Sequence, residues 1–316
     1  MKFVRTLVAA AGCVVCAALF LSGVSPAADR VVTVGFQKYG NLILLKGRGG
    51  LESRLAPLGF RVEWREFPSG PPLLEALNAG AIDFGQTGET PPIFAQAAGV
   101  PLVYAGYEPP APQGEAILVP KDSSLKTLTD LKGKKIALTK GANVHFLLVR
   151  ALEKADLKYS EIEPIYLAPA DGRAAFERGA VDAWVIWDPF LAAAETATDA
   201  RKLVDATGLA WNRQFYLASQ QFADANPAAV DAILAAVADL GQWAAGKDSE
   251  VANKLSAGIG IPAPVLEIAL KRLTYGVRPL DAEVVADQQR IADTFFNLGL
   301  VPKQIVVSSV VRKPAS

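Results

Sequence analysis

The sequence reads Leu77-Asn-Ala-Gly80-Ala-Ile-Asp83-Phe-Gly-Gln-Thr-Gly-Glu89-Thr-Pro91, and about a hundred residues later it reads Phe176-Glu-Arg-Gly179-Ala-Val-Asp182-Ala-Trp-Val-Ile-Trp-Asp188-Pro189. A shift of 99 positions aligns Gly80 with Gly179 and Asp83 with Asp182. Each copy has the pattern of a helix ending at a Gly C-cap, a short apolar strand, a loop and an acidic or Pro-bearing start to the next helix. Many copies would indicate a solenoid, but two copies inside longer β/α runs predict two similar α/β lobes with a cleft between them.

The first lobe is expected to begin with an alternation of strands and helices. Strands are predicted at residues 31–36, 61–67, 82–84 and 101–106, with helices between them. This order is typical of a largely parallel sheet with helices on both faces.

The second lobe is predicted to be inserted into the first. The Pro-rich segment Glu108-Pro-Pro-Ala-Pro112 is the clearest linker, and a second run of strands and helices follows it. Residues 210–216 are expected to cross back, and the mostly helical remainder from Gln221 to pack on the first lobe. We therefore assign residues 29–110 and 212–316 to lobe 1 and residues 111–211 to lobe 2. Two crossings between lobes would form a hinge.

Residues 1–28 have the pattern of a secretory signal peptide. Lys2 and Arg5 precede an apolar stretch over residues 7–21, and small residues mark a cleavage site near Ala27 or Ala28. The apolar stretch is short for a membrane span, which needs roughly 20 residues. We expect a protein that is exported to the periplasm and freed from its leader.

Charge and cysteine content exclude several partners for the mature chain. Cys13 and Cys16 both lie inside the leader, so neither a disulfide nor a thiol site is expected after cleavage. Removing Lys2 and Arg5 from the 32 basic residues leaves 30 against 32 acidic ones, a formal charge of −2. This balance gives no basic surface for nucleic acid. A small molecule, or a membrane protein contacted transiently, is the expected partner.

Enzyme signatures are absent from the sequence. It contains no GxSxG, no P-loop and no complete GxGxxG, and its single histidine, His145, excludes an HExxH zinc site. Glu89 and Asp188 could be imagined as paired carboxylates, but each stands where a helix is predicted to begin, and helix capping explains both better. We expect no catalysis, no metal and no bound cofactor.

The remaining candidate residues lie in loops that follow strands and precede helices. In parallel α/β sheets, ligands bind at the carboxyl ends of the strands, where helix N-termini offer unpaired N–H groups that suit an anion. The candidate loops are residues 37–41, 87–90, 141–145 and 170–173, together with Trp187 and Asp188.

Several of these side chains allow more than one interpretation. His145 lies off the apolar stripe of the helix predicted from Asn143, which would be its cap, so a solvated His or a ligand donor is expected rather than a core His. Arg173 is either an ordinary surface residue or a counter-charge for a bound anion. Trp187 and Tyr39 are either core residues or walls against the organic part of a ligand.

Segments along the whole mature chain resemble the aliphatic sulfonate-binding proteins of ATP-driven importers. The segments are Phe36-Gln-Lys-Tyr-Gly40, Gly80-Ala-Ile-Asp-Phe-Gly85, Thr87-Gly-Glu-Thr-Pro-Pro92, Tyr107-Glu-Pro-Pro-Ala-Pro112, Leu131-Lys-Gly-Lys-Lys135, Lys140-Gly-Ala-Asn-Val-His145, Asp182-Ala-Trp-Val-Ile-Trp-Asp-Pro-Phe190 and Tyr275-Gly-Val-Arg-Pro279. The resemblance implies a periplasmic-binding-protein fold of type II, in which each lobe is a mixed sheet flanked by helices and the ligand lies in the interlobe cleft. It also implies a monomer that delivers an organosulfonate to a membrane permease.

The resemblance places Gln37, the Thr87-Gly88 turn, Asn143, His145 and Trp187 around the ligand. With the neighbouring loop residues, the predicted ligand-binding set is Gln37, Tyr39, Gly40, Asn41, Thr87, Gly88, Glu89, Thr90, Gly141, Asn143, His145, Arg173, Trp187 and Asp188. Relatives often carry Asp in place of Glu89 and a smaller residue in place of Tyr39, so the preferred tail of the ligand stays open. Taurine, nitrate or a sulfate ester are alternative ligands, and an enzyme on the same fold, as in pyrimidine synthesis, is the rival from another class.

Overall fold

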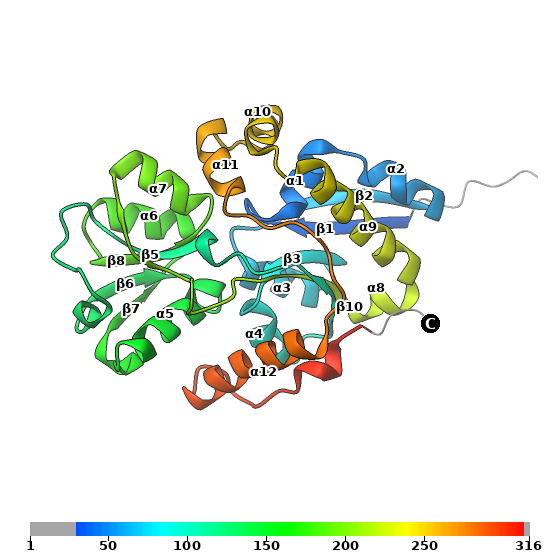
Figure 1. The fold of residues 1–316 in the computed structure, drawn as a ribbon. Helices are drawn as coiled ribbons and strands as arrows, with labels where there is room; N and C mark the ends of the chain where they lie inside the picture. Colours follow the sequence, from blue (N-terminus) through cyan, green and yellow to red (C-terminus); the bar gives the residue numbers. More distant parts are fainter. Residues whose placement is uncertain (1–29, 313–316) are drawn as a thin grey trace, which may run out of the picture.

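A computed structural model describes residues 30–312, so the predicted signal peptide with Cys13 and Cys16 lies outside the described residues. Between Arg30 and Arg312, no helix is both long and apolar enough to span a membrane. The described chain forms two five-stranded sheets, each flanked by helices (Figure 1). This confirms the predicted two-lobed α/β architecture.

The first sheet has the strand order β2-β1-β3-β10-β4. Its strands are β1 (Arg30–Phe36), β2 (Phe60–Glu66), β3 (Phe84–Gly88), β4 (Leu102–Tyr107) and β10 (Gln214–Ser219). Strand β1 runs parallel to β2 and β3, whereas β10 pairs antiparallel with both β3 and β4. The sheet is therefore mixed. The alternation of strands and helices alone predicted a largely parallel sheet, because it does not show that a strand returning from the second sheet inserts between β3 and β4.

The second sheet repeats this plan with the order β7-β6-β8-β5-β9. Its strands are β5 (Glu115–Val119), β6 (Lys135–Leu138), β7 (Glu163–Tyr166), β8 (Ala183–Trp187) and β9 (Arg201–Asp205). Strand β6 runs parallel to β7 and β8, and β5 is antiparallel to β8 and β9. One antiparallel strand thus lies between the parallel strands and the edge strand of each sheet.

Nine helices accompany the first sheet within the described residues, and three accompany the second. The first group is α1 (Asn41–Arg48), α2 (Leu51–Leu55), α3 (Gly70–Asn78), α4 (Pro91–Ala98), α8 (Gln220–Ala225), α9 (Pro227–Ala244), α10 (Asp248–Ile259), α11 (Ala263–Leu270) and α12 (Ala282–Asn297). The second group is α5 (Asn143–Lys154), α6 (Pro169–Glu177) and α7 (Phe190–Thr198). Their apolar faces bury the two sheets, and one core cluster extends from Leu73 in α3 to Leu147 in α5. Burial of such apolar surface is the main stabilising contribution to the fold.

The repeated stretches adopt the same local structure in both halves. Gly80 and Gly179 follow α3 and α6 with φ of 69° and 67°, a left-handed conformation that favours glycine. Asp83 then accepts the backbone N–H of Thr33 at 2.8 Å, and Asp182 accepts that of Lys135 at 2.8 Å. Each aspartate thereby joins its own strand to the neighbouring parallel strand, which explains why the sequence carries it twice.

The chain passes from the first sheet to the second through residues 108–114, and returns through residues 206–213. The returning segment is fixed by a buried ion pair in which Arg213 Nη1 lies 2.6 Å from Asp287 Oδ2 of α12. On the opposite side, Arg272 follows α11 and contacts Asp188 and Glu195 of the second half. Contacts of this kind hold the two sheets around a central cavity.

Candidate functional site

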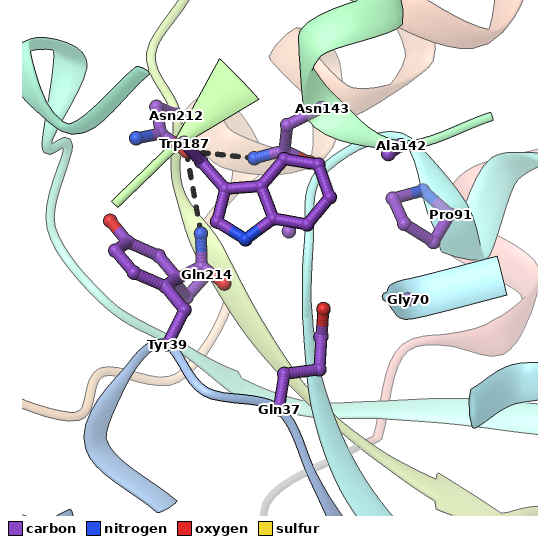
Figure 2. A pocket seen from close by; sticks show the side chains of 10 residues that line it. Gln37, Tyr39, Gly70, Pro91, Ala142, Asn143, Trp187, Asn212 and Gln214 are labelled. Carbon is purple, nitrogen blue, oxygen red and sulfur yellow. Dashed lines mark hydrogen bonds between the residues drawn. The ribbon is translucent and has the colours of Figure 1, made fainter. Parts of the chain in front are cut away.

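A narrow cavity lies between the two sheets, at the ends of β1, β3 and β8 (Figure 2). Its free volume is about 20 Å³, which is about enough for one water molecule, since a water needs roughly 10–15 Å³ by this measure. The lining residues come from both halves of the chain: Gln37, Tyr39, Gly70, Gly88, Pro91, Ala142, Asn143, Trp187, Asn212 and Gln214. We call this space the head cavity.

Three helices begin at the head cavity. Gly70 opens α3, Pro91 opens α4, and Ala142 precedes α5, which begins at Asn143. Helix N-termini carry unpaired N–H groups and the positive end of the helix dipole. Pro91 and Pro92 have no N–H, so α4 contributes its dipole. Pro71 and Pro72 lack one as well, so α3 adds only the N–H of Gly70 in its first three residues, whereas α5 adds the N–H groups of its first turn. The cavity is therefore electropositive without any cationic side chain in its lining.

A chain of amide hydrogen bonds crosses the cavity wall (Figure 2). The Asn143 Nδ2 donates to Asn212 Oδ1 at 2.8 Å, and Asn212 Nδ2 donates to the Ala111 carbonyl at 2.8 Å. The Asn143 Oδ1 accepts the N–H of Thr90 at 3.3 Å, and Gln214 Nε2 donates to Asn212 Oδ1 at 3.4 Å. Helix α5 of the second half is thus tied to the first half and to the returning segment. Asn143 does not cap α5 as the sequence predicted, because its side chain reaches across to the other sheet.

Neutral amide groups supply the side-chain donors of this cavity. Gln37 Nε2 donates to the Gln86 carbonyl at 3.0 Å, and an amide nitrogen carries two hydrogens. Gln37, Asn143 and Gln214 each have a second N–H beyond the bond described, and all three line the cavity. Such a site suits a small anion that is permanently charged, because neutral donors need no titrating partner to hold it.

Gly88 brings the backbone of β3 against Asn143. A Cβ at this position would lie 1.9 Å from Asn143 Oδ1, far inside van der Waals contact. Only glycine therefore permits both the cavity wall and the amide chain to exist in this arrangement.

Five of the fourteen predicted ligand-binding residues line the head cavity: Gln37, Tyr39, Gly88, Asn143 and Trp187. Others form the framework behind it. Asn41 and Gln86 donate to the buried Glu108 Oε1, each at 2.8 Å, and Gly40 adopts a φ of 82° beside Gln86. Thr87 and Thr90 are fully buried. These residues shape the cavity without facing it.

His145 is a core residue, so the prediction of a solvated histidine is wrong, and His145 does not line the head cavity. Its side chain is fully buried; Nδ1 accepts the N–H of Gly141 at 3.2 Å, and Nε2 lies 2.9 Å from the Tyr159 hydroxyl oxygen. Burial, aided by the charge of Lys140, lowers the pKa of His145 to about 3. Its ring centroid lies 5.1 Å from that of Phe295 in α12, a contact partner 150 positions away. The neutral ring holds the loop before α5 in place.

Arg173 is the surface residue that was one of its two predicted alternatives, whereas Glu89 differs from its prediction. Arg173 pairs with Glu177 at 2.6 Å and lines a separate groove instead of the head cavity. Glu89 does not cap α4: it accepts the backbone N–H groups of Asn212 at 3.2 Å and Arg213 at 3.1 Å. Burial raises the pKa of Glu89 to about 7. This side chain fixes the returning segment against the end of β3.

Asp188 does cap a helix, as predicted. Its Oδ1 accepts the N–H of Ala192 in the first turn of α7 at 3.0 Å. Burial raises the pKa of Asp188 to about 6, although the charge of Arg272 opposes the shift. It is therefore a structural carboxylate in contact with the first half of the chain.

Sequence reasoning missed five lining residues, namely Gly70, Pro91, Ala142, Asn212 and Gln214. The first three stand at predicted helix starts and could have been included on that ground. Asn212 has a φ of 51°, a left-handed conformation that Asn tolerates, and it lies in a segment predicted only as a crossing. No sequence pattern places that segment in the cavity, because its position depends on β10 returning between β3 and β4.

Glu108 provides a test of the buried framework. Burial raises its pKa to about 7, against the hydrogen bonds from Tyr216, Asn41 and Gln86. Since the pKa of Glu108 is higher in the folded protein than in the unfolded chain, the folded protein keeps the proton between about pH 4.5 and 7, where the unfolded chain loses it. Tighter binding of the proton stabilises the fold at low pH, and this stabilisation is lost as the pH rises through 7. Glu108→Gln cannot titrate. As the pH is raised from 4.5 to 8, the unfolding free energy of wild type should therefore fall by up to about 3 kcal/mol relative to that of Glu108→Gln.

Urea unfolding at several pH values measures this difference. Glu163→Gln makes the same change on an exposed edge strand and is the control. A difference between Glu108→Gln and wild type that stays constant with pH would contradict a protonated Glu108.

Comparison with known proteins supports the family assignment. The family model described as NMT1/THI5 like matches residues 61–250. An aliphatic sulfonates-binding protein of Escherichia coli (strain K12) is 44% identical over 292 residues, which cover 92% of this chain and 90% of that protein. The crystal structure of the periplasmic aliphatic sulphonate binding protein SsuA from Escherichia coli superposes with a TM-score of 0.82 at 43% identity, covering 91% of this chain and 93% of that chain.

A second solved structure is similar over nearly its full length. The alkanesulfonate-binding protein SsuA from Xanthomonas axonopodis pv. citri, bound to MOPS, has a TM-score of 0.86 at 41% identity. The match covers 90% of this chain and 99% of that chain.

Proposed function

Because this chain belongs to the NMT1/THI5-like family and, within it, to the periplasmic aliphatic sulfonate-binding proteins, we propose that it captures organosulfonates in the head cavity and delivers them to the permease of an ATP-driven importer. It acts as an exported monomer. Its role is binding and not catalysis, and uptake of sulfonates serves sulfur acquisition.

The convergence of three helix N-termini on a cavity lined by neutral amides carries this proposal. A sulfonate is anionic at every ordinary pH, and its three oxygens can accept several N–H donors at once. The Gly70 end of α3 and the Asn143 end of α5 come from different halves of the chain. A ligand held by both helix ends binds more tightly to the closed conformation than to the open one. This difference in affinity shifts the population toward the closed conformation.

The residues proposed to contact the sulfonate are Gln37, Asn143 and Gln214 through their amide N–H groups, with Gly88 and Trp187 as walls. Arg173 is not part of this set, because it lies in a separate groove. Opening and closing would occur about residues 108–114 and 206–213.

Calorimetric titration of the mature protein tests the ligand. The panel contains ethanesulfonate, taurine, sulfate and nitrate. We expect one-to-one binding of ethanesulfonate, with sulfate and nitrate at least 100-fold weaker, because neither carries an organic tail. Preferred binding of nitrate or of taurine would replace the sulfonate assignment by that ligand.

A further inference from the structure

We propose that Arg272 is a latch between the two halves, which stabilises the closed conformation from outside the head cavity and thereby sets the affinity for every ligand by the same factor. This inference rests on the proposed function, because it concerns the closure that retains a bound anion. Arg272 lies outside the lining of the head cavity, so it acts as a positioning residue and does not touch the ligand.

The guanidinium group of Arg272 lies between two carboxylates of the second half. Its Nη2 donates to Glu195 Oε2 at 2.7 Å, and its Nη1 lies 3.4 Å from Asp188 Oδ1 and 3.5 Å from Asp188 Oδ2. Arg272 follows α11 of the first half, Asp188 follows β8, and Glu195 lies in α7. Arg213, which pairs with α12, belongs to the returning segment. Within residues 30–312, the pairs of Arg272 are therefore the only ion pairs that join the two halves directly.

The two sides of this contact are anchored in different core clusters. Leu270 of α11 packs in the apolar cluster that contains Val34 of β1. Leu191 of α7 packs in the cluster that contains Val185 of β8. Each side should therefore move with its own half. Opening about the two crossings between the halves would separate the guanidinium group from both carboxylates, so the latch exists only in the closed conformation.

Burial makes this contact important for closure. The Asp188 side chain is fully buried, and those of Arg272 and Glu195 are 15% and 22% exposed. Lys202 lies 3.6 Å from Glu195, but within the described residues Arg272 is the only cation in an ion pair with Asp188. A buried carboxylate that loses its cation is strongly unfavourable. A neutral residue at position 272 should therefore destabilise the closed conformation, whereas water can hydrate the same carboxylates when the halves separate.

The effect on binding follows from the population of the closed conformation. A ligand that binds this conformation has an apparent affinity that falls in proportion to the fraction of closed protein. Loss of the latch should thus raise the dissociation constants of different ligands by one common factor. A residue that touches the ligand would instead change them by different factors.

Arg272→Gln tests the latch. Ethanesulfonate and propanesulfonate are titrated calorimetrically at pH 8, where Asp188 is ionised because its pKa is about 6. We expect both dissociation constants to rise about tenfold or more, by the same factor. Arg272→Lys keeps the charge and should lie between Arg272→Gln and wild type. Lys271→Gln is the matched control, because Lys271 pairs with Glu267 of its own half at 2.8 Å, and it should bind as wild type.

The outcomes separate the latch from the proposed function. Affinities of Arg272→Gln within about threefold of wild type, or losses that differ between the two sulfonates, overturn the latch while the sulfonate function stands. So does an equal loss in Lys271→Gln. Thermal unfolding of each variant verifies that it is folded before titration.

Failure of wild type to bind any sulfonate overturns the proposed function, and the latch is then tested without ligand. The sequence has no cysteine after Cys16, so spin labels can be attached at Arg178→Cys in the second half and Asn253→Cys in the first, both at exposed positions. Pulsed electron paramagnetic resonance then measures the distance between the halves. We expect a longer mean distance in ligand-free Arg272→Gln than in ligand-free protein with Arg272. Equal distances overturn the latch.

Discussion

Gly88→Ala is expected to weaken ethanesulfonate binding at least 100-fold. A methyl group at this position would lie 1.9 Å from Asn143 Oδ1 and 2.1 Å from Asn143 Nδ2, so the Asn143 side chain must move. Its movement breaks the 2.8 Å bond to Asn212 and the 3.3 Å bond from Thr90. The variant thereby loses both a ligand donor and a link between the two halves, and the methyl group also narrows the head cavity.

Calorimetric titration of the variant measures this loss. Gly258→Ala is the matched control, because the added Cβ at this helical glycine meets nothing within 4 Å. We expect the control to bind as wild type and to unfold at the same or a slightly higher temperature. Wild-type affinity in Gly88→Ala would show that Asn143 is not needed at the ligand.

Asn212→Asp should weaken binding by about 100-fold or more at pH 8. The change keeps the size of the side chain, and a carboxylate can still accept from Asn143 and Gln214, but it can no longer donate to the Ala111 carbonyl. It also puts a negative charge in the lining of the head cavity. Two like charges about 6 Å apart repel by about 3 kcal/mol at an effective dielectric constant of 20, which corresponds to roughly 100-fold in affinity.

The pH dependence identifies repulsion as the cause. A buried Asp beside an anion takes up a proton as pH falls, so the affinity of Asn212→Asp should recover between pH 8 and 5. The exposed change Asn253→Asp in α10 serves as the control and should bind as wild type throughout. A loss in Asn212→Asp that does not vary with pH would point to a distorted structure instead of charge repulsion.

The repeated sequence predicted the two halves because each copy has the same structural role within its own sheet. Gly80 and Gly179 end helices, and Asp83 and Asp182 join parallel strands, in the same way in both sheets. Local patterns also located the helix starts that surround the head cavity, since strand ends and helix starts can be read from a single run of residues.

Other features could not be predicted because they depend on contacts between distant residues. His145 was expected to face solvent or ligand, but α12 covers it with Phe295, and no property of its own helix indicates that contact. Asn212 enters the cavity only because β10 inserts between β3 and β4. Arg173 was expected in a first helical turn, but α6 begins at Pro169, so Arg173 is its fifth residue and lines a separate groove.

A crystal structure of the mature protein with ethanesulfonate tests the central claim most directly. We expect the sulfonate in the head cavity, with its oxygens accepting from the N-terminus of α5 and from the side-chain amides of Gln37 and Asn143, and with Trp187 against its organic part. A sulfonate found beside Arg173 or elsewhere outside the cavity lined by Gly88 and Asn143 would contradict this account.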